Sequence, residues 1–255
     1  MPRSQHDKNP RLDALVGRRP VVELLKAGSS VESVLVAAGA RPSVVLDEIR
    51  RLARERNVTV REVDRGEIDR LAEDINHQGV AALTGRYRYM PVSGLLGNSA
   101  QAVLFLDGVM DPHNLGSLLR SADGAGFDGV VIPAHRSSAV TQTVRRVSAG
   151  ASEVVPVARE VNLGRAIESA RRAGLWIVGL DHEADEDLWT SQLMDPPVGL
   201  VLGSEDRGMS RGVREKCDGL VRIPSLGRLS SLNVAVAGAL AMFEVTRRRA
   251  RSATL

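Results

Sequence analysis

The chain of 255 residues contains a single cysteine, 3% aromatic residues and no long apolar run. The lone Cys217 excludes an internal disulfide framework, so the cytoplasm is the expected compartment. No apolar stretch approaches the roughly 20 residues of a membrane span. The residues up to Pro20 are polar and lack the apolar core of a signal peptide, so we expect neither secretion nor a membrane partner.

The shortage of aromatic side chains bears on RNA recognition, because proteins that read single-stranded RNA commonly stack its bases on aromatic rings. With 3% aromatic residues, RNA contacts here are expected to rest on phosphate groups and shape. Basic residues gather at both ends: 1–20 hold five against two acidic residues, and 245–255 hold four arginines and no acid. Basic ends suit a polyanion such as nucleic acid, although charge alone fits solvated tails equally well.

Hydrophobic periodicity divides the chain into a basic tail (1–11), a small α/β domain (12–86), a linker (87–100) and a larger domain (101–255). In the small domain, the expected helices are 20–27, 43–57 and 66–74, and the expected strands are 34–38, 58–63 and 79–83. The linker is predicted from its polar composition, with Pro91, Gly94, Gly97 and Asn98.

The larger domain alternates apolar runs with helical patterns, which predicts a parallel sheet covered by helices on both faces. The expected strands are 102–106, 130–132, 154–157, 175–180, 198–202 and 220–223. The expected helices are 115–124, 140–149, 162–173 and 232–248. Ligands of such sheets bind beyond the carboxyl ends of the strands, so the residues that follow each apolar run are candidates for a site.

Three patterns resemble functional motifs but do not meet their requirements. Residues 124–129 match G-x-G-x-x-G, yet they follow a helical pattern and precede a strand, which is the reverse of a dinucleotide-binding turn and argues against a nicotinamide oxidoreductase. His182 and Glu183 begin like a zinc-protease helix, but the second histidine is missing and no metal site is expected. Cys217 has no activating base in its local sequence and is better interpreted as a small buried hydrophobic residue.

The segment 106–120 is the first of three that carry polar residues just after a predicted strand. Asn114 is expected to cap the helix that follows, and Arg120 lies in an apolar stretch of that helix. From the residues alone, pairing of Arg120 with Asp107 or Asp111 is as well supported as ligand binding.

The two other segments follow later strands. Residues 202–209 form a charged turn between two glycines, with Glu205 inside it, and such a loop offers backbone N–H groups to a ligand. Residues 223–234 gather Ser230, Ser231 and Asn233 at a helix start. Capping needs one such residue, so the cluster exceeds the structural need.

In chain order the segments read N-x-G-x-x-x-R (114–120), G-S-E-x-x-G (203–208) and S-L-N (231–233). Together they resemble motifs 1, 2 and 3 of the SpoU (TrmH-type) branch of the SPOUT RNA methyltransferases, over roughly residues 100–248. Residues 16–21 and 77–81 resemble the start and end of the substrate-binding domain that precedes the catalytic domain in ribosomal-RNA members. The departures, none of which removes a polar group assigned to catalysis, are Asp206-Arg207, Ser225 and Ala235.

The resemblance implies both a fold and an activity. The catalytic domain is expected to form a deep trefoil knot, a rare exception to unknotted topology, and to pair with a second copy as a homodimer. Family members transfer a methyl group from S-adenosylmethionine to a ribose 2′-hydroxyl of RNA, and no metal is implied. The residues that match catalytic positions are Asn114, Arg120, Glu205, Ser231 and Asn233, and those that match cofactor-binding positions are Gly203, Ile223 and Leu232.

The role of Arg120 and the identity of the RNA have alternatives. The family's counterpart of Arg120 is proposed as a general base, but a guanidinium keeps its proton in proteins, so we favour an anchor for the target phosphate. A guanosine of 23S rRNA is the expected target, because minimal tRNA-modifying members often lack the N-terminal domain. The alternatives are a tRNA 2′-O-methyltransferase, an antibiotic-resistance rRNA methyltransferase and a non-catalytic RNA-binding protein.

In the N-terminal domain, arginines are the candidates for RNA contacts. A solvated face of ion pairs explains the same helix equally well, because acidic residues alternate with the basic ones there. The candidates are Arg18, Arg19, Arg50, Arg51 and Arg54.

Overall fold

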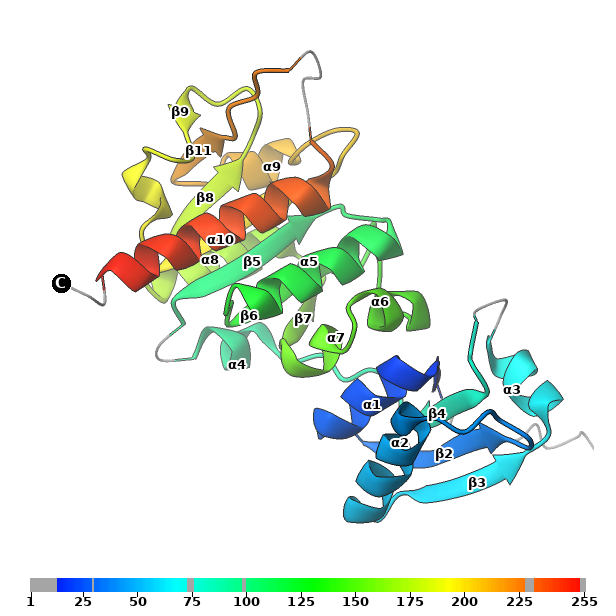
Figure 1. The fold of residues 1–255 in the computed structure, drawn as a ribbon. Helices are drawn as coiled ribbons and strands as arrows, with labels where there is room; N and C mark the ends of the chain where they lie inside the picture. The colour runs from blue at the N-terminus through cyan, green and yellow to red at the C-terminus, as the bar shows by residue number, and fades with distance from the viewer. Residues whose placement is uncertain (1–12, 29, 73–75, 98–99, 228–231, 253–255) are drawn as a thin grey trace, which may run out of the picture. The chain divides into compact units, whose positions relative to one another are not determined.

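The computed structural model describes residues 13–28, 30–72, 76–97, 100–227 and 232–252 (Figure 1). The expected basic tail and the serines Ser230 and Ser231, of which Ser231 is a catalytic candidate, therefore lie outside the described residues. The chain divides into two compact units, Met1–Arg88 and Tyr89–Leu255.

The N-terminal unit contains a mixed four-stranded sheet with helices on both faces. Its strand order is β1-β4-β2-β3, in which β4 runs antiparallel to β1 and β2, and β3 runs parallel to β2. Apolar residues of α1 and α2 cover one face, and those of α3 cover the other. The elements are β1 (Asp13–Val16), α1 (Arg18–Lys26), β2 (Val31–Ala37), α2 (Val44–Glu55), β3 (Thr59–Val63), α3 (Arg65–Ala72) and β4 (Val80–Thr84). The periodicity predicts every one of them except β1, whose four residues are too few to show an alternation.

Arg18, a candidate for RNA contacts, holds parts of the N-terminal unit together. Its guanidinium donates hydrogen bonds to the backbone carbonyls of Gln78 at 3.1 Å and Arg41 at 2.8 Å, and to the Ser43 hydroxyl. It thereby ties the start of α1 to two loops that lie far from it in the sequence.

The C-terminal unit contains the predicted parallel sheet, which the structure confirms. Seven strands follow the order β7-β6-β5-β10-β8-β11-β9, and each neighbouring pair is parallel. All six residues of β10 are buried, as expected for a central strand that is covered on both faces. The strands are β5 (Ala102–Asp107), β6 (Gly129–Pro133), β7 (Val157–Glu160), β8 (Trp176–Leu180), β9 (Glu186–Asp187), β10 (Val198–Gly203) and β11 (Gly219–Arg222).

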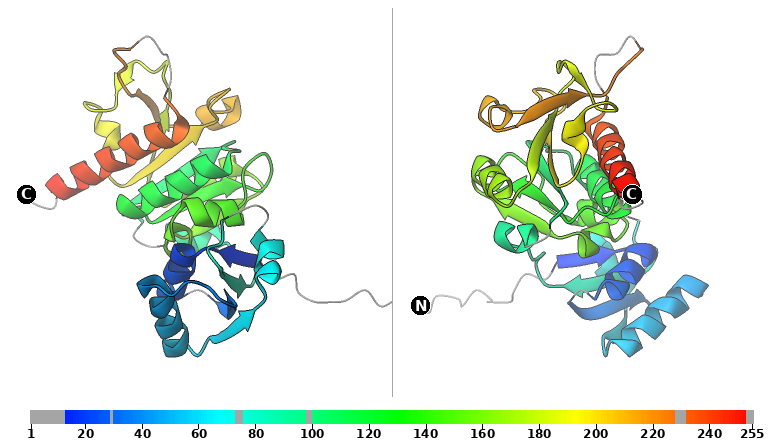
Figure 2. Two further views of the ribbon diagram at one scale, coloured as in Figure 1. Left: turned by 45° about the vertical axis from the view of Figure 1, so that its right-hand side comes forward. Right: turned by 90° about the vertical axis from the view of Figure 1, so that its left-hand side faces the viewer.

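Helices cover the two faces of this sheet (Figure 2). On one face, a continuous core joins the strands to α4 (Val92–Leu96), α8 (Leu163–Arg172) and α9 (Arg211–Arg214). On the other face lie α5 (Pro112–Gly124) and α10 (Val234–Ser252), and the short helices α6 (Gln142–Val147) and α7 (Ala151–Val154) pack against α5. A Cβ at Gly238 of α10 would lie 2.5 Å from the Leu118 side chain and 2.6 Å from the Leu202 side chain, so glycine allows this helix to lie close to α5 and β10. Within the described ranges, no helix is both long and apolar enough to cross a bilayer.

Two local features differ from the expected elements. The stretch 87–100, expected as a linker, contributes α4 to the core of the C-terminal unit through Val92, Leu95 and Leu96. A helix of one turn among proline and glycine leaves no periodic signal in the sequence. The expected strand 154–157 is also wrong, because α7 ends at Val154 and β7 begins at Val157. Pro156 separates the two, although the whole run is apolar.

Candidate functional site

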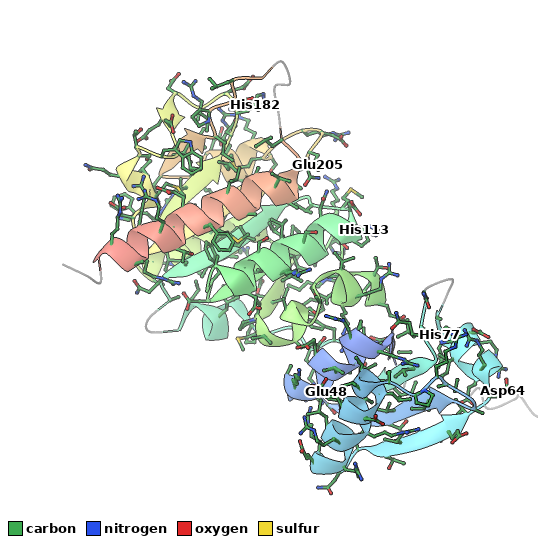
Figure 3. The ribbon with its side chains drawn as sticks, in the orientation of Figure 1. Glu48, Asp64, His77, His113, His182 and Glu205 are labelled. Atoms are coloured by element: carbon green, nitrogen blue, oxygen red, sulfur yellow. The ribbon has the colours of Figure 1, made fainter. Side chains whose placement is uncertain are left out.

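Loops at the carboxyl edge of the parallel sheet bring the three motif segments together. The strands β5 and β10 are paired in register, so their last residues, Asp107 and Gly203, lie side by side. Figure 3 shows Glu205 beside the start of α10 and His113 near the start of α5. This is the edge at which parallel α/β sheets bind their ligands.

A hydrogen-bonded cluster joins one side chain from each motif. The Nδ2 amide of Asn233 donates to Oδ1 of Asn114 at 3.0 Å and to Oε1 of Glu205 at 2.5 Å. The same oxygen of Glu205 accepts a hydrogen bond from the backbone N–H of Val234, the first residue of α10, at 3.2 Å. Asn114 is buried. Three of the five predicted catalytic residues are therefore in direct contact, and we name them the polar cluster (Asn114, Glu205 and Asn233).

Asn233 also caps α10. Its Oδ1 accepts hydrogen bonds from the backbone N–H groups of Ala235 at 3.0 Å and Val236 at 3.2 Å. The oxygen of the amide is thus bound by the helix, and its nitrogen is bound by the polar cluster. Serine and aspartate cap helices as well as asparagine does, but neither supplies the amide donor.

Asn114 is not the N-cap of α5, contrary to the sequence-based expectation. The helix begins at Pro112, and Asp111 caps it by accepting a hydrogen bond from the His113 N–H at 2.9 Å. Proline is favoured at the first helical position because its missing N–H leaves no bond unmade there. The backbone hydrogen bond from His113 also holds the pKa of Asp111 below its ordinary value. Asn114 is therefore released from capping and pairs with Asn233.

A cavity of about 520 Å³ lies at this edge, and we name it the cofactor cavity. Gly203, Ile223 and Leu232, the three predicted cofactor-binding residues, all line it, together with the loop 204–208. Small-molecule and cofactor sites usually measure roughly 300–1,000 Å³, so the volume suits a nucleoside cofactor. A Cβ at Gly203 would lie 2.1 Å from the carbonyl carbon of Gly208, so only glycine lets the loop fold back over the strand end.

The loop after β8 contributes residues to this cavity that the motif comparison omits. Asp181, His182 and Glu183 line the cofactor cavity, and so does Arg214, whose guanidinium bonds the Asp181 carboxylate. The pair His182 and Glu183 attracts attention in the sequence only as an incomplete zinc motif. Its place directly after a strand is the signal that identifies it as part of a ligand site.

Arg120 lies apart from the polar cluster of its own chain. Six helical residues separate it from Asn114, which places it about 240° around α5 and about 9 Å along the axis. It is exposed, and within the described ranges its guanidinium has no hydrogen-bond or ion-pair partner. Pairing with Asp107 or Asp111 is therefore wrong for this chain. Asp107 instead accepts a hydrogen bond from the Ser210 N–H.

Cys217 has no chemical role at this edge. Burial raises the pKa of its thiol to about 12, and its Sγ donates to the Val213 carbonyl at 3.6 Å. A thiol that stays protonated is a poor nucleophile and a poor metal ligand. In the part of the chain that the structure describes, no group of three or more His, Cys, Asp or Glu side chains is placed to hold a metal ion.

Comparisons with known proteins agree with this geometry. Residues 14–90 match the family described as RNA 2′-O ribose methyltransferase substrate binding, and residues 101–243 match the SpoU rRNA Methylase family. The chain belongs to the SpoU rRNA methylase family. The resemblance drawn from the three motifs is thereby confirmed.

Individual relatives cover nearly the whole chain. A Staphylococcus saprophyticus protein assigned to the TrmH family of tRNA/rRNA methyltransferases is 42% identical over 240 residues, which span 92% of this chain and 95% of that protein. The SpoU methyltransferase AviRb from Streptomyces viridochromogenes, solved with AdoMet, has a TM-score of 0.80 and 26% identity, over 94% of this chain and 91% of its own. The AdoMet-bound rRNA methyltransferase from Sinorhizobium meliloti has a TM-score of 0.77 and 26% identity, over 93% and 87%.

Family membership settles the class of enzyme. The protein is an RNA methyltransferase that depends on S-adenosylmethionine, the methyl donor of SpoU methyltransferases. The cofactor cavity fits this donor in volume and in its mixture of apolar walls and charged rim, with Leu202 and Val234 facing the same space as Glu183. Gly203, Ile223 and Leu232 are among the residues that line it.

Proposed function

We propose that the protein methylates the 2′-hydroxyl of a guanosine ribose in 23S rRNA. The polar cluster carries this proposal, because it joins one side chain of each motif and its Glu205 lines the cofactor cavity. The match of residues 14–90 to a 2′-O ribose methyltransferase substrate-binding family supports the ribose as acceptor. The rRNA methyltransferase from S. meliloti supports ribosomal RNA, and a cytoplasmic location follows from that substrate.

Bound S-adenosylmethionine supplies an electrophilic methyl group. The protein's part is to hold the acceptor hydroxyl in line with it, which alone supplies much of the acceleration. The Nδ2 of Asn114 remains available as a donor to a ribose oxygen, because its Oδ1 is the atom bound to Asn233. Within the described residues, the Oε2 of Glu205 remains available and would accept the proton of the acceptor hydroxyl as that oxygen is methylated.

A homodimer that packs through α5 and α10 is also part of the proposal. Val236, Leu240 and Phe243 are 50%, 39% and 50% exposed, and their spacing places them on one face of α10. Arg120 extends from the adjacent α5 without a partner among the described residues. A second copy over this face would cover the apolar stripe and bring the Arg120 of each copy toward the polar cluster of the other, where it would bind the target phosphate.

The trefoil knot that the family implies is a proposal as well. It is supported by the strand order, because β10 inserts between β5 and β8, which both precede it in the chain. After β11, α10 returns to pack against α5 and β10. Such a return of the chain across elements already in place is what a knot requires.

A mixed dimer tests the placement of Arg120. Arg120→Ala and Asn233→Asp are each expected to lower activity at least about tenfold. Coexpressed with different tags, they form mixed dimers in which one site combines Asn233 of one copy with Arg120 of the other. With random pairing, activity should return to about one quarter of the wild-type value. Coexpression of two differently tagged Arg120→Ala copies is the control, and a mixture no more active than either variant would place Arg120 in its own chain's site.

The proposed function itself is tested by methylation of defined RNAs. The purified protein is incubated with labelled S-adenosylmethionine and separately with unmodified 23S rRNA, 16S rRNA or bulk tRNA, and the products are digested to nucleosides. We expect label in 2′-O-methylguanosine from 23S rRNA. Label in tRNA would support the proposed 2′-O-methylation but would show that tRNA, and not 23S rRNA, is the substrate. Label on a base would show that the ribose is not the methyl acceptor. If the protein binds S-adenosylmethionine but labels no RNA, a non-catalytic RNA-binding protein would be favoured.

A further inference from the structure

A second cavity, of about 850 Å³, shares the loop 204–208 with the cofactor cavity. Asn114 lines the second cavity but not the first. Further walls come from segments that follow strands, at 107–111, 133–136 and 162–164. A group held in this space meets one end of the polar cluster, while the donor occupies the neighbouring cavity. The second cavity is thus placed to receive the methyl acceptor.

Three arginine and lysine side chains line the second cavity, and they differ in what they contact. Lys216 is bonded to Glu168, and Arg207 also lines the cofactor cavity. Arg136 lines the second cavity alone, is exposed, and has no side-chain partner within the described part of the chain. Of the three, Arg136 is therefore the cation that is dedicated to this cavity and free to bind an anion.

The backbone at Arg136 has an uncommon conformation. Its φ is 55°, in the left-handed region that residues other than glycine rarely adopt. The surrounding loop is bound on both sides: the Ser138 N–H donates to the Val109 carbonyl at 2.9 Å, and Arg159 donates to the Ala134 carbonyl at 2.8 Å. A strained conformation persists only where neighbours enforce it. The loop therefore fixes the backbone of Arg136, from which the side chain extends.

Within the described residues, none of the acidic groups of the cavity forms an ion pair with Arg136. Asp107 and Asp111 each accept a backbone N–H, and Glu205 belongs to the polar cluster. Asp206 lies on the wall that both cavities share. An uncharged ribose can approach these carboxylates as a hydrogen-bond donor, whereas a phosphate group would be repelled by them and is attracted to Arg136.

We propose that Arg136 binds the phosphodiester group next to the target ribose and so positions the acceptor hydroxyl at the polar cluster. This inference rests on the proposed function, because it assumes that RNA enters the second cavity. A guanidinium binds two phosphate oxygens at once and thereby fixes orientation as well as position. Arg120 lines neither cavity in its own chain and would reach the site only from a second copy, so Arg136 is the phosphate contact that each chain supplies to its own second cavity.

The test compares Arg136→Gln with Arg172→Gln, an exposed arginine on α8 that lines neither cavity. For Arg136→Gln we expect KM for RNA to rise about tenfold, and the slope of log binding constant against log salt to fall by about one, as for the loss of one phosphate contact. Calorimetry should show unchanged affinity for S-adenosylmethionine. Arg136→Lys should keep the wild-type salt slope, because lysine retains the positive charge. Its KM for RNA should still rise above the wild-type value, because an ammonium group cannot bind two phosphate oxygens as a guanidinium does. Arg172→Gln should match the wild type in all three measurements.

Two results would overturn the inference alone. If the wild type methylates RNA and Arg136→Gln keeps its KM and salt slope, Arg136 does not touch the substrate. If Arg136→Gln instead loses affinity for S-adenosylmethionine, the residue acts through the cofactor cavity. A wild-type protein that neither binds nor methylates RNA would overturn the proposed function and the inference with it, and the salt titration of the wild type distinguishes that case.

Discussion

Replacing Asn233 by aspartate should lower kcat/KM for RNA by about 100-fold while the protein stays folded. The new carboxylate keeps an oxygen that caps α10 and accepts the N–H groups of Ala235 and Val236. It loses the Nδ2 donor that holds Asn114 and Glu205, and it places a second negative charge against the Glu205 carboxylate. Like charges at hydrogen-bond distance repel, so Glu205 should turn away from the acceptor hydroxyl.

Asn233→Ser separates the lost amide from the added charge. Serine caps the helix, carries no charge and supplies no amide donor, so we expect a smaller loss of about tenfold. Both variants should melt within about 4 °C of the wild type, because each keeps the cap. The measurements are steady-state kinetics at saturating S-adenosylmethionine and a thermal melt. Wild-type kcat/KM in Asn233→Asp would remove the polar cluster from the catalytic machinery.

The sequence predicts the members of the polar cluster through the resemblance of its three segments to the family motifs, and each segment follows an apolar run that predicts a strand. Glu205 comes directly after a run that becomes β10, and Asn233 precedes a long helical pattern. What no local pattern contains is the pairing of β5 with β10, which brings motif 1 beside motif 2. The partner of Asn114 follows from that pairing, so the sequence alone suggests a cap for Asn114 instead of a bond to Asn233.

Arg120 and Arg136 differ in how far the sequence predicts their positions. The position of Arg120 away from Asn114 follows from helical geometry alone, since six residues place it on another face of the helix. Arg136 leaves no such signal. Its left-handed backbone lies in a loop that is bound to Val109, after β5, and to Arg159 of β7. No turn residue such as glycine marks the position in the sequence.

The arginines at the end of α10 are expected to have a large effect on stability. Arg248→Ala should destabilise the C-terminal unit by about 3–5 kcal/mol, the range for breaking one partner of a buried ion pair. The Arg248 side chain is 10% exposed and donates to Glu244 at 2.7 Å. It also donates to the carbonyls of Ser191, Trp189 and Leu188, at 2.5, 2.8 and 3.3 Å. This basic residue therefore holds a loop to the helix and is not a free contact for a polyanion.

Arg247→Ala is the matched control. Arg247 binds the same Glu244 carboxylate from the adjacent position, but its side chain is 44% exposed and forms hydrogen bonds with Glu244 alone within the described ranges. Its removal should therefore destabilise the unit much less, because water replaces the lost contact. Denaturant unfolding followed by tryptophan fluorescence measures this unit specifically, since Trp176 and Trp189 are the two tryptophans of the chain and both belong to it.

The pH dependence separates the ion pair from the carbonyl bonds. Arg247 and Arg248 hold the pKa of Glu244 below its ordinary value of 4.5. A lowered carboxyl pKa adds stability above the ordinary value, and that stability is lost as the pH falls through the lowered pKa. The difference in unfolding free energy between the wild type and Arg248→Ala should therefore narrow as the pH falls below about 4.5. Arg248 also donates to the Asp195 carboxylate at 3.1 Å. A gap that stays constant would therefore show that the three loop carbonyls, and neither carboxylate, account for the stabilising effect of Arg248.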